Sequence, residues 1–300
     1  MGDDAALWKP RAGFETILTT DWFLEGTHFL RNLHSPDSVA WKCLARAVSD
    51  VAAMGGEPRC FLLSLALPES CTGKWMDGFL GGLRRASRKL GCPLAGGDTT
   101  RRKEILINIS VIGETEEGRA VKRKGARAGD RIFASGRLGE AELGLRLIRR
   151  GPKFVAKDRA LLHKHLFPEA RVALGSWLSA KRMATAMIDL SDGLSTDLTR
   201  LCEASGAGAR IYLSKLPLAS RVFEGRFGVR ARVHAALNGG DDYELLFSTA
   251  RHDAPRIPKR ISGVQITEIG EITRGSEVRA VNSSGEEIPL RPAGWDPFRK

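Results

Sequence analysis

Six short segments spread along the chain place carboxylates beside glycine, serine or threonine. Small residues of this kind are expected where the backbone must approach a ligand closely. Carboxylates gathered in one place repel each other unless cations lie among them, and Mg²⁺ binds carboxylates together with substrate phosphates. The pattern therefore predicts a magnesium–phosphate site. The six segments are GDD at 2–4, TTD at 19–21, SD at 49–50, GGDTT at 96–100, DLSDG at 189–193 and GGDDYE at 239–244.

The DLSDG segment has the most distinctive context of the six. An apolar run over 184–188 leads into a tight turn, and a helix is expected to begin directly after it. Serine and aspartate at such a position can cap the helix and do nothing more. Alternatively, the helix N-terminus offers its N–H groups to phosphate while Asp189 and Asp192 hold magnesium. Two carboxylates three residues apart exceed what a cap needs, but both interpretations stay open at this point.

The other candidate residues are weaker signals when each is taken alone. TTD is expected at the end of a strand, and GGDTT just before one. Asp50 lies in a helix that opens near Pro36; a helical carboxylate is usually solvated, but the surrounding apolar residues favour a place facing the site. His28 is the one histidine near an acidic motif. Tyr243 and Trp295 are either packing residues or stacking platforms for a flat ligand.

Charge and motif content exclude several classes of protein. The chain has 300 residues, a formal net charge of +12 and a pI near 9.8. Its Lys and Arg clusters are dispersed and no nucleic-acid-binding module is recognisable, so the charge indicates a solvated surface that steers anionic substrates inward. Arg123, within KRK at 122–124, is either part of a basic linker or a contact to nucleotide phosphates. P-loop, Rossmann, HExxH and GxSxG motifs are absent from the sequence.

Cysteine usage and hydropathy point to a cytoplasmic protein without membrane or nucleic-acid partners. No stretch approaches the ~20 apolar residues of a membrane span, and the N-terminus does not resemble a secretory signal. The five cysteines are odd in number and form no CxxC pair, which favours reduced packing residues.

Hydrophobic periodicity predicts two α+β domains, over 1–118 and 119–300, joined through a hydrophilic stretch at 114–130. The first is expected to bind ATP and magnesium and to dimerise, and the second to complete the nucleotide and substrate site. Strands are expected at 16–20, 61–67, 105–112, 131–134, 209–213, 243–248 and 264–270. Helices are expected at 36–54, 75–90, 140–149, 168–180 and 194–204.

Taken together, the motifs resemble a known family. The order GDDAA, TTDWFLEGTHF, WKCLARAVSDVAAMGGEP, GGDTT, IDLSDGLSTDL, GGDDYELLF and GWDPF resembles thiamine-monophosphate kinases, which belong to the aminoimidazole ribonucleotide synthetase superfamily. The resemblance runs from residue 2 to about residue 298. It implies that ATP and thiamine monophosphate give thiamine diphosphate and ADP by in-line transfer with several Mg²⁺ ions. It also implies a two-domain α+β architecture whose N-terminal sheets pair in a homodimer.

The resemblance further implies roles for individual residues. No general acid or base is implied, because the acceptor is an already ionised phosphate and the difficulty is electrostatic. The magnesium shell would be Asp4, Thr19, Thr20, Asp21, Asp50, Asp98, Asp189 and Asp192. ATP contacts would be Gly97, Asp98, Arg123 and Ser191, and thiamine phosphate contacts would be His28, Asp241 and Trp295.

Two departures and several alternatives remain at this stage. The family carries a further helix before its GDD motif, and it usually has GGEDYE where this chain has GGDDYE, so Asp241 is one methylene shorter. Related ATP-using enzymes, namely aminoimidazole ribonucleotide synthetase and selenophosphate synthetase, would bind ATP and magnesium similarly. The selenium enzyme expects a reactive cysteine near the N-terminus, whereas the first cysteine here is Cys43, within a helix. A basic nucleic-acid-binding protein would leave the acidic turns unexplained, and a nucleotide-binding protein without turnover is a further alternative.

Overall fold

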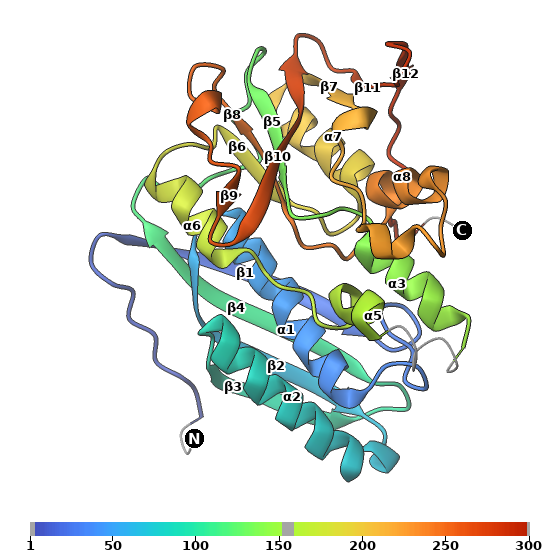
Figure 1. The fold of residues 1–300 in the computed structure, drawn as a ribbon. Coiled ribbons are helices and arrows are strands. Elements are labelled where there is room, and N and C mark those ends of the chain that lie inside the picture. Colours follow the sequence, from blue (N-terminus) through green and yellow to red (C-terminus); the bar gives the residue numbers. More distant parts are fainter. Residues whose placement is uncertain (1–3, 152–158, 299–300) are drawn as a thin grey trace.

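The first half of the chain forms a four-stranded sheet with two helices on one face (Figure 1). The structure is a computed structural model that describes residues 4–151 and 159–298. The strand order is β1-β4-β2-β3, in which β4 is antiparallel to both neighbours and β2 is parallel to β3. The elements are β1 (Phe14–Leu24), α1 (Pro36–Ala53), β2 (Glu57–Leu67), a 3₁₀ turn (Glu69–Cys71), α2 (Lys74–Leu90), β3 (Leu94–Arg101) and β4 (Leu106–Glu116).

Alternation along the strands gives this sheet two different faces. Successive side chains of a strand point to opposite sides. Ile17 and Phe23 of β1 are buried in the core, whereas Leu18 and Trp22 are 74% and 54% exposed. Leu62 of β2 is also exposed. The strand register through β4 puts it on the same face as Leu18 and Trp22 of β1. The sheet therefore has one face packed in the core and one open face with apolar side chains.

The second half contains a larger mixed sheet with helices around it (Figure 1). Its strand order is β12-β11-β7-β10-β5-β8-β6, and β9 pairs with β10 outside this path. The strands are β5 (Arg131–Ser135), β6 (Ala186–Asp189), β7 (Gly208–Tyr212), β8 (Leu245–Thr249), β9 (Arg260–Ile261), β10 (Val264–Thr273), β11 (Val278–Val281) and β12 (Glu287–Pro289). The helices are α3 (Glu140–Arg149), α5 (Arg159–Leu166), α6 (Val172–Ala180), α7 (Leu194–Ser205) and α8 (Val229–Asn238).

Helix α1 connects the two halves. It contacts β1, β2 and β4 of its own sheet and also α5, α6 and β6 of the second half. Trp41 donates its indole N–H to the carbonyl of Pro168 at 2.8 Å, and Ser49 donates its hydroxyl to Asp189 at 2.6 Å. A helix that is apolar on nearly all sides belongs in a core. The polar side chains Lys42 and Ser49 of α1 bond residues of the second half and so lie where the two halves meet.

The expected two-part α+β organisation is confirmed, and several local predictions were wrong. Thr19, Thr20 and Asp21 lie inside β1 rather than at its end, and Asp98 lies inside β3 rather than before a strand. The β3 sequence LAGGDTTR has almost no apolar residues, because this edge strand buries little. The predicted helix at 168–180 begins at Val172, and α5, α8, β3, β6, β9, β11 and β12 were not predicted.

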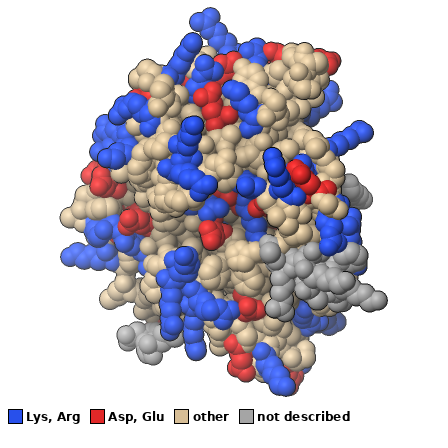
Figure 2. Space-filling view, in the orientation of Figure 1, with Lys and Arg blue, Asp and Glu red and all other residues tan. Residues whose placement is uncertain are grey.

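The cysteines, the helices and the charged residues each bear on the expectations from composition. All five cysteines are buried and unpaired. Among the described residues, no helix is both long and apolar enough to cross a membrane. Lys and Arg side chains are scattered over the face drawn in Figure 2, with Asp and Glu side chains between them.

Candidate active site

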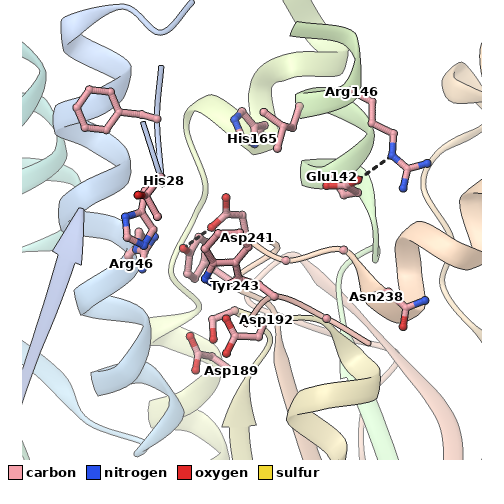
Figure 3. A pocket seen from close by; sticks show the side chains of 18 of the residues that line it. His28, Arg46, Glu142, Arg146, His165, Asp189, Asp192, Asn238, Asp241 and Tyr243 are labelled. Carbon is pink, nitrogen blue, oxygen red and sulfur yellow. Dashed lines mark hydrogen bonds and ion pairs between the residues drawn. The ribbon is translucent and has the colours of Figure 1, made fainter. Parts of the chain in front are cut away.

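A cavity of about 510 Å³ lies between the two halves, and most of the predicted site residues line it (Figure 3). Its walls come from the loop after β1, one side of α1, helix α3, and the two acidic turns of the second half. The C-terminal segment closes it with Trp295. The predicted residues on its lining are Asp21, His28, Asp50, Asp189, Ser191, Asp192, Asp241 and Trp295.

One side of α1 carries charged and polar groups at helical spacing, of which Arg46 and Asp50 line this cavity. Lys42, Arg46, Ser49 and Asp50 are four, three and one residues apart, so they lie along one side of the helix. Arg46 holds Asp21 through two bonds of 3.0 Å each. The helix thus places the cation of Arg46 and the carboxylate of Asp50 on the lining of the cavity, and buried Lys42 bonds Asp241.

Asp50 and Asp189 form the electrostatically strained centre of the site. Asp50 accepts a hydrogen bond from Thr19 at 2.5 Å, and Asp189 accepts one from Ser49 at 2.6 Å. Burial raises the pKa of Asp50, and burial together with the neighbouring Asp50 carboxylate raises the pKa of Asp189 to about 8. Among the described residues, neither carboxylate forms a salt bridge, so the pair would be stabilised by a bound cation.

In the turn at Asp189 to Gly193, the start of α7 is capped by a residue other than Asp189 and Asp192. Asp197, in the first turn of α7, accepts the backbone N–H groups of Asp192 and Gly193, each at 3.0 Å. Asp197 therefore does the capping that the sequence left open for Asp189 and Asp192. Asp192 bonds Arg200, and its side chain is still 22% exposed toward the cavity. Both carboxylates remain available to a ligand.

His28 and Trp295 approach each other on one wall of the cavity. Their ring centroids are 6.4 Å apart at an angle of 57°. The Leu24 amide donates to Nδ1 of His28 at 3.0 Å, and burial followed by the nearby Arg46 lowers the pKa of His28 to about 4. The ring is therefore neutral near pH 7 and carries its proton on Nε2, as a donor.

The C-terminal segment that carries Trp295 is fixed to the start of α7. Trp295 donates its backbone N–H to the carbonyl of Asp192 at 2.9 Å, and Gly294 donates to the hydroxyl of Thr196 at 3.0 Å. A Cβ on Gly294 would overlap the Asp192 carbonyl oxygen. The close approach explains why glycine is required there.

The GGDDYE turn is held in an uncommon backbone conformation. Asp241 and Tyr243 have positive φ angles of 67° and 49°. Asp241 accepts from Lys42 Nζ and from the Tyr243 hydroxyl, both at 2.7 Å. Although burial opposes ionisation, the attraction of Lys42 and Arg46 holds the pKa of Asp241 well below its usual range. Strain of this kind is typical of functional turns.

The next two carboxylates of this turn anchor it. Asp242 accepts the backbone N–H groups of Gly139 and Ala141, at the start of α3. Glu244 is fully buried and accepts from Lys164 and Arg171 at 2.7 to 2.8 Å, which lowers its pKa to about 2 despite burial. These contacts fix the position of Asp241 relative to α3 and α5.

A second cavity, of about 470 Å³, meets the first at Asp50 and Asp189. Arg123 and Lys122 line it, together with Thr19 and apolar residues of β1, α1 and β6. The attraction of Arg123 opposes the rise in the pKa of both Asp50 and Asp189. The two central carboxylates therefore lie between a cavity with Arg123 and a cavity with His28, Asp241 and Trp295.

Known proteins match this chain over nearly its whole length. Residues 2–115 match the model of the AIR synthase related protein N-terminal domain, and residues 127–282 match that of the C-terminal domain. The thiamine-monophosphate kinase of Aquifex aeolicus (strain VF5) is 36% identical over 301 residues, covering 99% of this chain and 92% of the relative. That of Escherichia coli (strain K12) is 35% identical over 305 residues, covering 99% and 91%.

The chain belongs to the thiamine-monophosphate kinase family. Solved structures agree. The thiamine-monophosphate kinase from Stenotrophomonas maltophilia K279a superposes with a TM-score of 0.86 at 34% identity, over 96% of this chain and 90% of that one. The structure of AaThiL complexed with AMPPCP and TMP gives 0.85 at 35% identity, over 99% and 92%.

Four residues predicted from the likeness to thiamine-monophosphate kinases do not line either cavity in the single chain. Asp4 is exposed on the N-terminal segment, which leads away from the second half (Figure 1). The Thr20 hydroxyl bonds Asn108 and Ser110 on the open face of the sheet. Gly97 and Asp98 lie on the edge strand β3, and Asp98 pairs in register with exposed Ser64. Strand alternation directs the side chains of Thr20 and Asp98 away from α1, whereas Gly97 pairs with buried Leu63.

Other residues of the cavity were missed by reasoning from the sequence. They include Arg46, His34, His165 and Glu142 on the lining, and buried Lys42, which bonds the lining residue Asp241. The signal for Lys42 and Arg46 was two cations in the apolar helix that also carries Asp50. The histidines gave no signal, since His34 and His165 are 131 residues apart and meet only in the fold. Within the described residues, no three His, Cys, Asp or Glu side chains converge closely enough to form a metal cluster.

Proposed function

We propose that this chain transfers the γ-phosphoryl group of ATP to thiamine monophosphate, giving thiamine diphosphate and ADP. The meeting of two cavities at Asp50 and Asp189 is the observation that carries this proposal. Phosphoryl transfer between two anions needs their phosphates aligned and their charge neutralised. A nucleotide in the cavity of Arg123 and a thiamine phosphate in the cavity of His28 would bring their phosphates together at these carboxylates.

Magnesium fits the donor set at the junction of the cavities. Asp189 is buried and Asp50 is half-buried, both have raised pKa values, and within the described parts of the chain neither forms a salt bridge, so a cation would lower their free energy. We assign the magnesium ligands to Asp21, Asp50, Asp189 and Asp192, with the Thr19 hydroxyl beside Asp50. Several Mg²⁺ ions bound there would neutralise the facing phosphates.

The chain's own residues would orient the two substrates. Arg123 adds positive charge at the nucleotide phosphates. His28 presents a neutral ring with its proton on Nε2, which can donate to a phosphate oxygen of the acceptor. Trp295 offers a half-exposed ring to the flat rings of thiamine. No side chain has to remove a proton, because the acceptor phosphate is ionised near neutral pH.

We also propose that the chain acts as a homodimer through the open face of its N-terminal sheet. This face carries exposed Leu18, Trp22 and Leu62, an apolar patch that a monomer would leave in water. Asp98 and Thr20 lie on the same face. Their magnesium and nucleotide roles therefore require a partner subunit. Sedimentation at micromolar concentration should give a dimer; a monomer would contradict this part of the proposal.

Asp4 remains a proposed magnesium ligand without support from the geometry of the single chain. We also propose that the reaction takes place in the cytoplasm; the five buried, unpaired cysteines support this, because free thiols persist there.

A substrate screen tests the function directly. The purified protein, ATP and Mg²⁺ are incubated with thiamine monophosphate or with purine-pathway substrates. Only thiamine monophosphate should give a diphosphate product. Turnover of an amidine-type purine substrate instead would favour an aminoimidazole ribonucleotide synthetase, and salt-dependent nucleic-acid binding without turnover would favour the remaining alternative.

A further inference from the structure

A chain of buried polar side chains crosses the wall of the cavity next to Asp241. Lys42 donates to Asp241 at 2.7 Å, and its Nζ lies 3.3 Å from Nδ1 of His165. Nε2 of His165 lies 3.0 Å from Nε2 of His34. Nδ1 of His34 lies 3.0 Å from the carbonyl oxygen of Leu30. The four contacts therefore connect the GGDDYE turn with the loop that follows β1.

The three side chains are so deeply buried that losing a hydrogen-bond partner would cost free energy. Lys42, His165 and His34 are 1%, 1% and 4% exposed. An uncompensated polar group costs free energy at such depth, and apolar side chains would fill the same space more stably. Buried polar groups are retained in some proteins because they fix one arrangement of the surrounding segments.

Lys42 sets the direction of hydrogen bonding along these contacts. Protonated Lys42 has only donors, so Nδ1 of His165 must accept and its proton must lie on Nε2. His165 then donates to Nε2 of His34, which puts the His34 proton on Nδ1, 3.0 Å from the Leu30 carbonyl oxygen. The Leu30 N–H also lies 3.1 Å from this Nδ1 and would be its donor in the opposite tautomer, so the tautomer of His34 depends on Lys42. Burial lowers the pKa of both histidines, to about 4 for His34, so both rings are neutral as this direction requires.

The hydrogen-bonded chain of side chains ends at the two segments that are proposed to contact thiamine phosphate. Asp241 lies at one end; at the other, Leu30 belongs to the loop that carries His28. His165 comes from α5 in the second half, whereas His34 and Lys42 come from the first. The chain therefore spans the junction of the two halves.

We propose that Lys42, His165 and His34 are positioning residues that set the separation of Asp241 and His28 for the phosphorylated acceptor. This inference rests on the proposed kinase function. It predicts that changes in these hydrogen-bonded residues weaken binding of the acceptor, thiamine monophosphate. ATP binding should stay unchanged, since Arg123 and the second cavity lie apart from them.

The first test needs no substrate. Nitrogen NMR of the wild-type protein at pH 7 should find His165 protonated on Nε2 and His34 protonated on Nδ1, both neutral. The opposite pair of tautomers, or a charged ring in either residue, would overturn the proposed chain. This result is independent of whether the protein turns over thiamine monophosphate.

The second test is kinetic. His165→Leu should raise the KM for thiamine monophosphate about tenfold, the scale of one lost hydrogen bond, with the KM for ATP unchanged. His165→Asn keeps an acceptor for Lys42 and cuts the contact to His34, so it should show the same selective rise if the Leu variant does not fold. His252→Leu, at an exposed histidine, is the matched control. The inference would be overturned if the KM values for both substrates rose together, or if neither KM changed.

A double-mutant cycle with His28 tests whether His34 acts by positioning the His28 loop or by stabilising the structure in general. If His34 acts through the His28 loop, His34→Leu should raise the acceptor KM in the wild-type protein but add nothing in a His28→Ala background. Effects that multiply would contradict the proposal. Absence of thiamine monophosphate turnover in the wild-type protein would instead reject the proposed function.

Discussion

Glu244 offers a quantitative test of how the GGDDYE turn is anchored. It is fully buried, and its two oxygens accept from Arg171, Lys164 and the hydroxyl of Ser135. These partners lower its pKa from the ordinary 4.5 to about 2. At 1.36 kcal/mol per pKa unit, the difference corresponds to about 3 kcal/mol of stability at pH 7. Removing one partner of a buried ion pair typically costs ~3–5 kcal/mol, which agrees.

The sign of the pH dependence follows from the lowered pKa. This contribution is fully present above the unfolded pKa of 4.5 and is lost as the pH falls toward 2. Glu244→Gln should therefore lower the free energy of unfolding by about 3 kcal/mol at pH 7 and by about half as much at pH 3. Denaturant unfolding at both pH values measures the difference.

A matched control lies two residues from Arg171. Glu169 also pairs with Arg171, but its side chain is 55% exposed. Glu169→Gln should therefore cost less than ~1 kcal/mol at either pH. A Glu244→Gln variant within 1 kcal/mol of wild type at pH 7, or an equal difference at pH 7 and pH 3, would refute the reasoning.

Three further predictions address the site. Asp189→Asn should raise the thermal stability of the metal-free protein, because it removes a buried carboxylate with a raised pKa, yet lower turnover at least ~100-fold; an active variant would contradict this. Trp295→Ala should raise the KM for thiamine monophosphate about tenfold with little change for ATP; equal effects on both would count against a stacking role. Gly294→Ala should show the same kinetic pattern, because a Cβ would displace the segment from the Asp192 carbonyl; a wild-type KM would show that the segment tolerates it.

Much of the site could be predicted because its residues lie in short local motifs. The apolar surroundings of Asp50 predicted that it faces the site, and in the structure it lines the cavity beside Asp189. The DLSDG turn begins a helix at Leu194 as expected. Local sequence could not separate capping from ligand binding there, because Asp197 reaches back to the turn only once the helix forms.

Other parts of the fold depend on contacts between distant residues. Asp98 looked equivalent to the other acidic turns, but its strand is at the far edge of the sheet from β1. Lys42 and His165 gain their roles from partners 199 and 123 residues away along the chain. No periodicity in the sequence contains that information. The division at residues 118 and 119 stays a prediction, although β4 ends at Glu116 and β5 begins at Arg131.

Phosphorus NMR of a complete reaction tests the central claim most directly. The wild-type protein is mixed with ATP, thiamine monophosphate and Mg²⁺, and the phosphate resonances are followed with time. Thiamine diphosphate and ADP should appear in equal amounts, and both should cease to form when a chelator removes Mg²⁺. Release of inorganic phosphate without thiamine diphosphate, or undiminished transfer without Mg²⁺, would contradict the account.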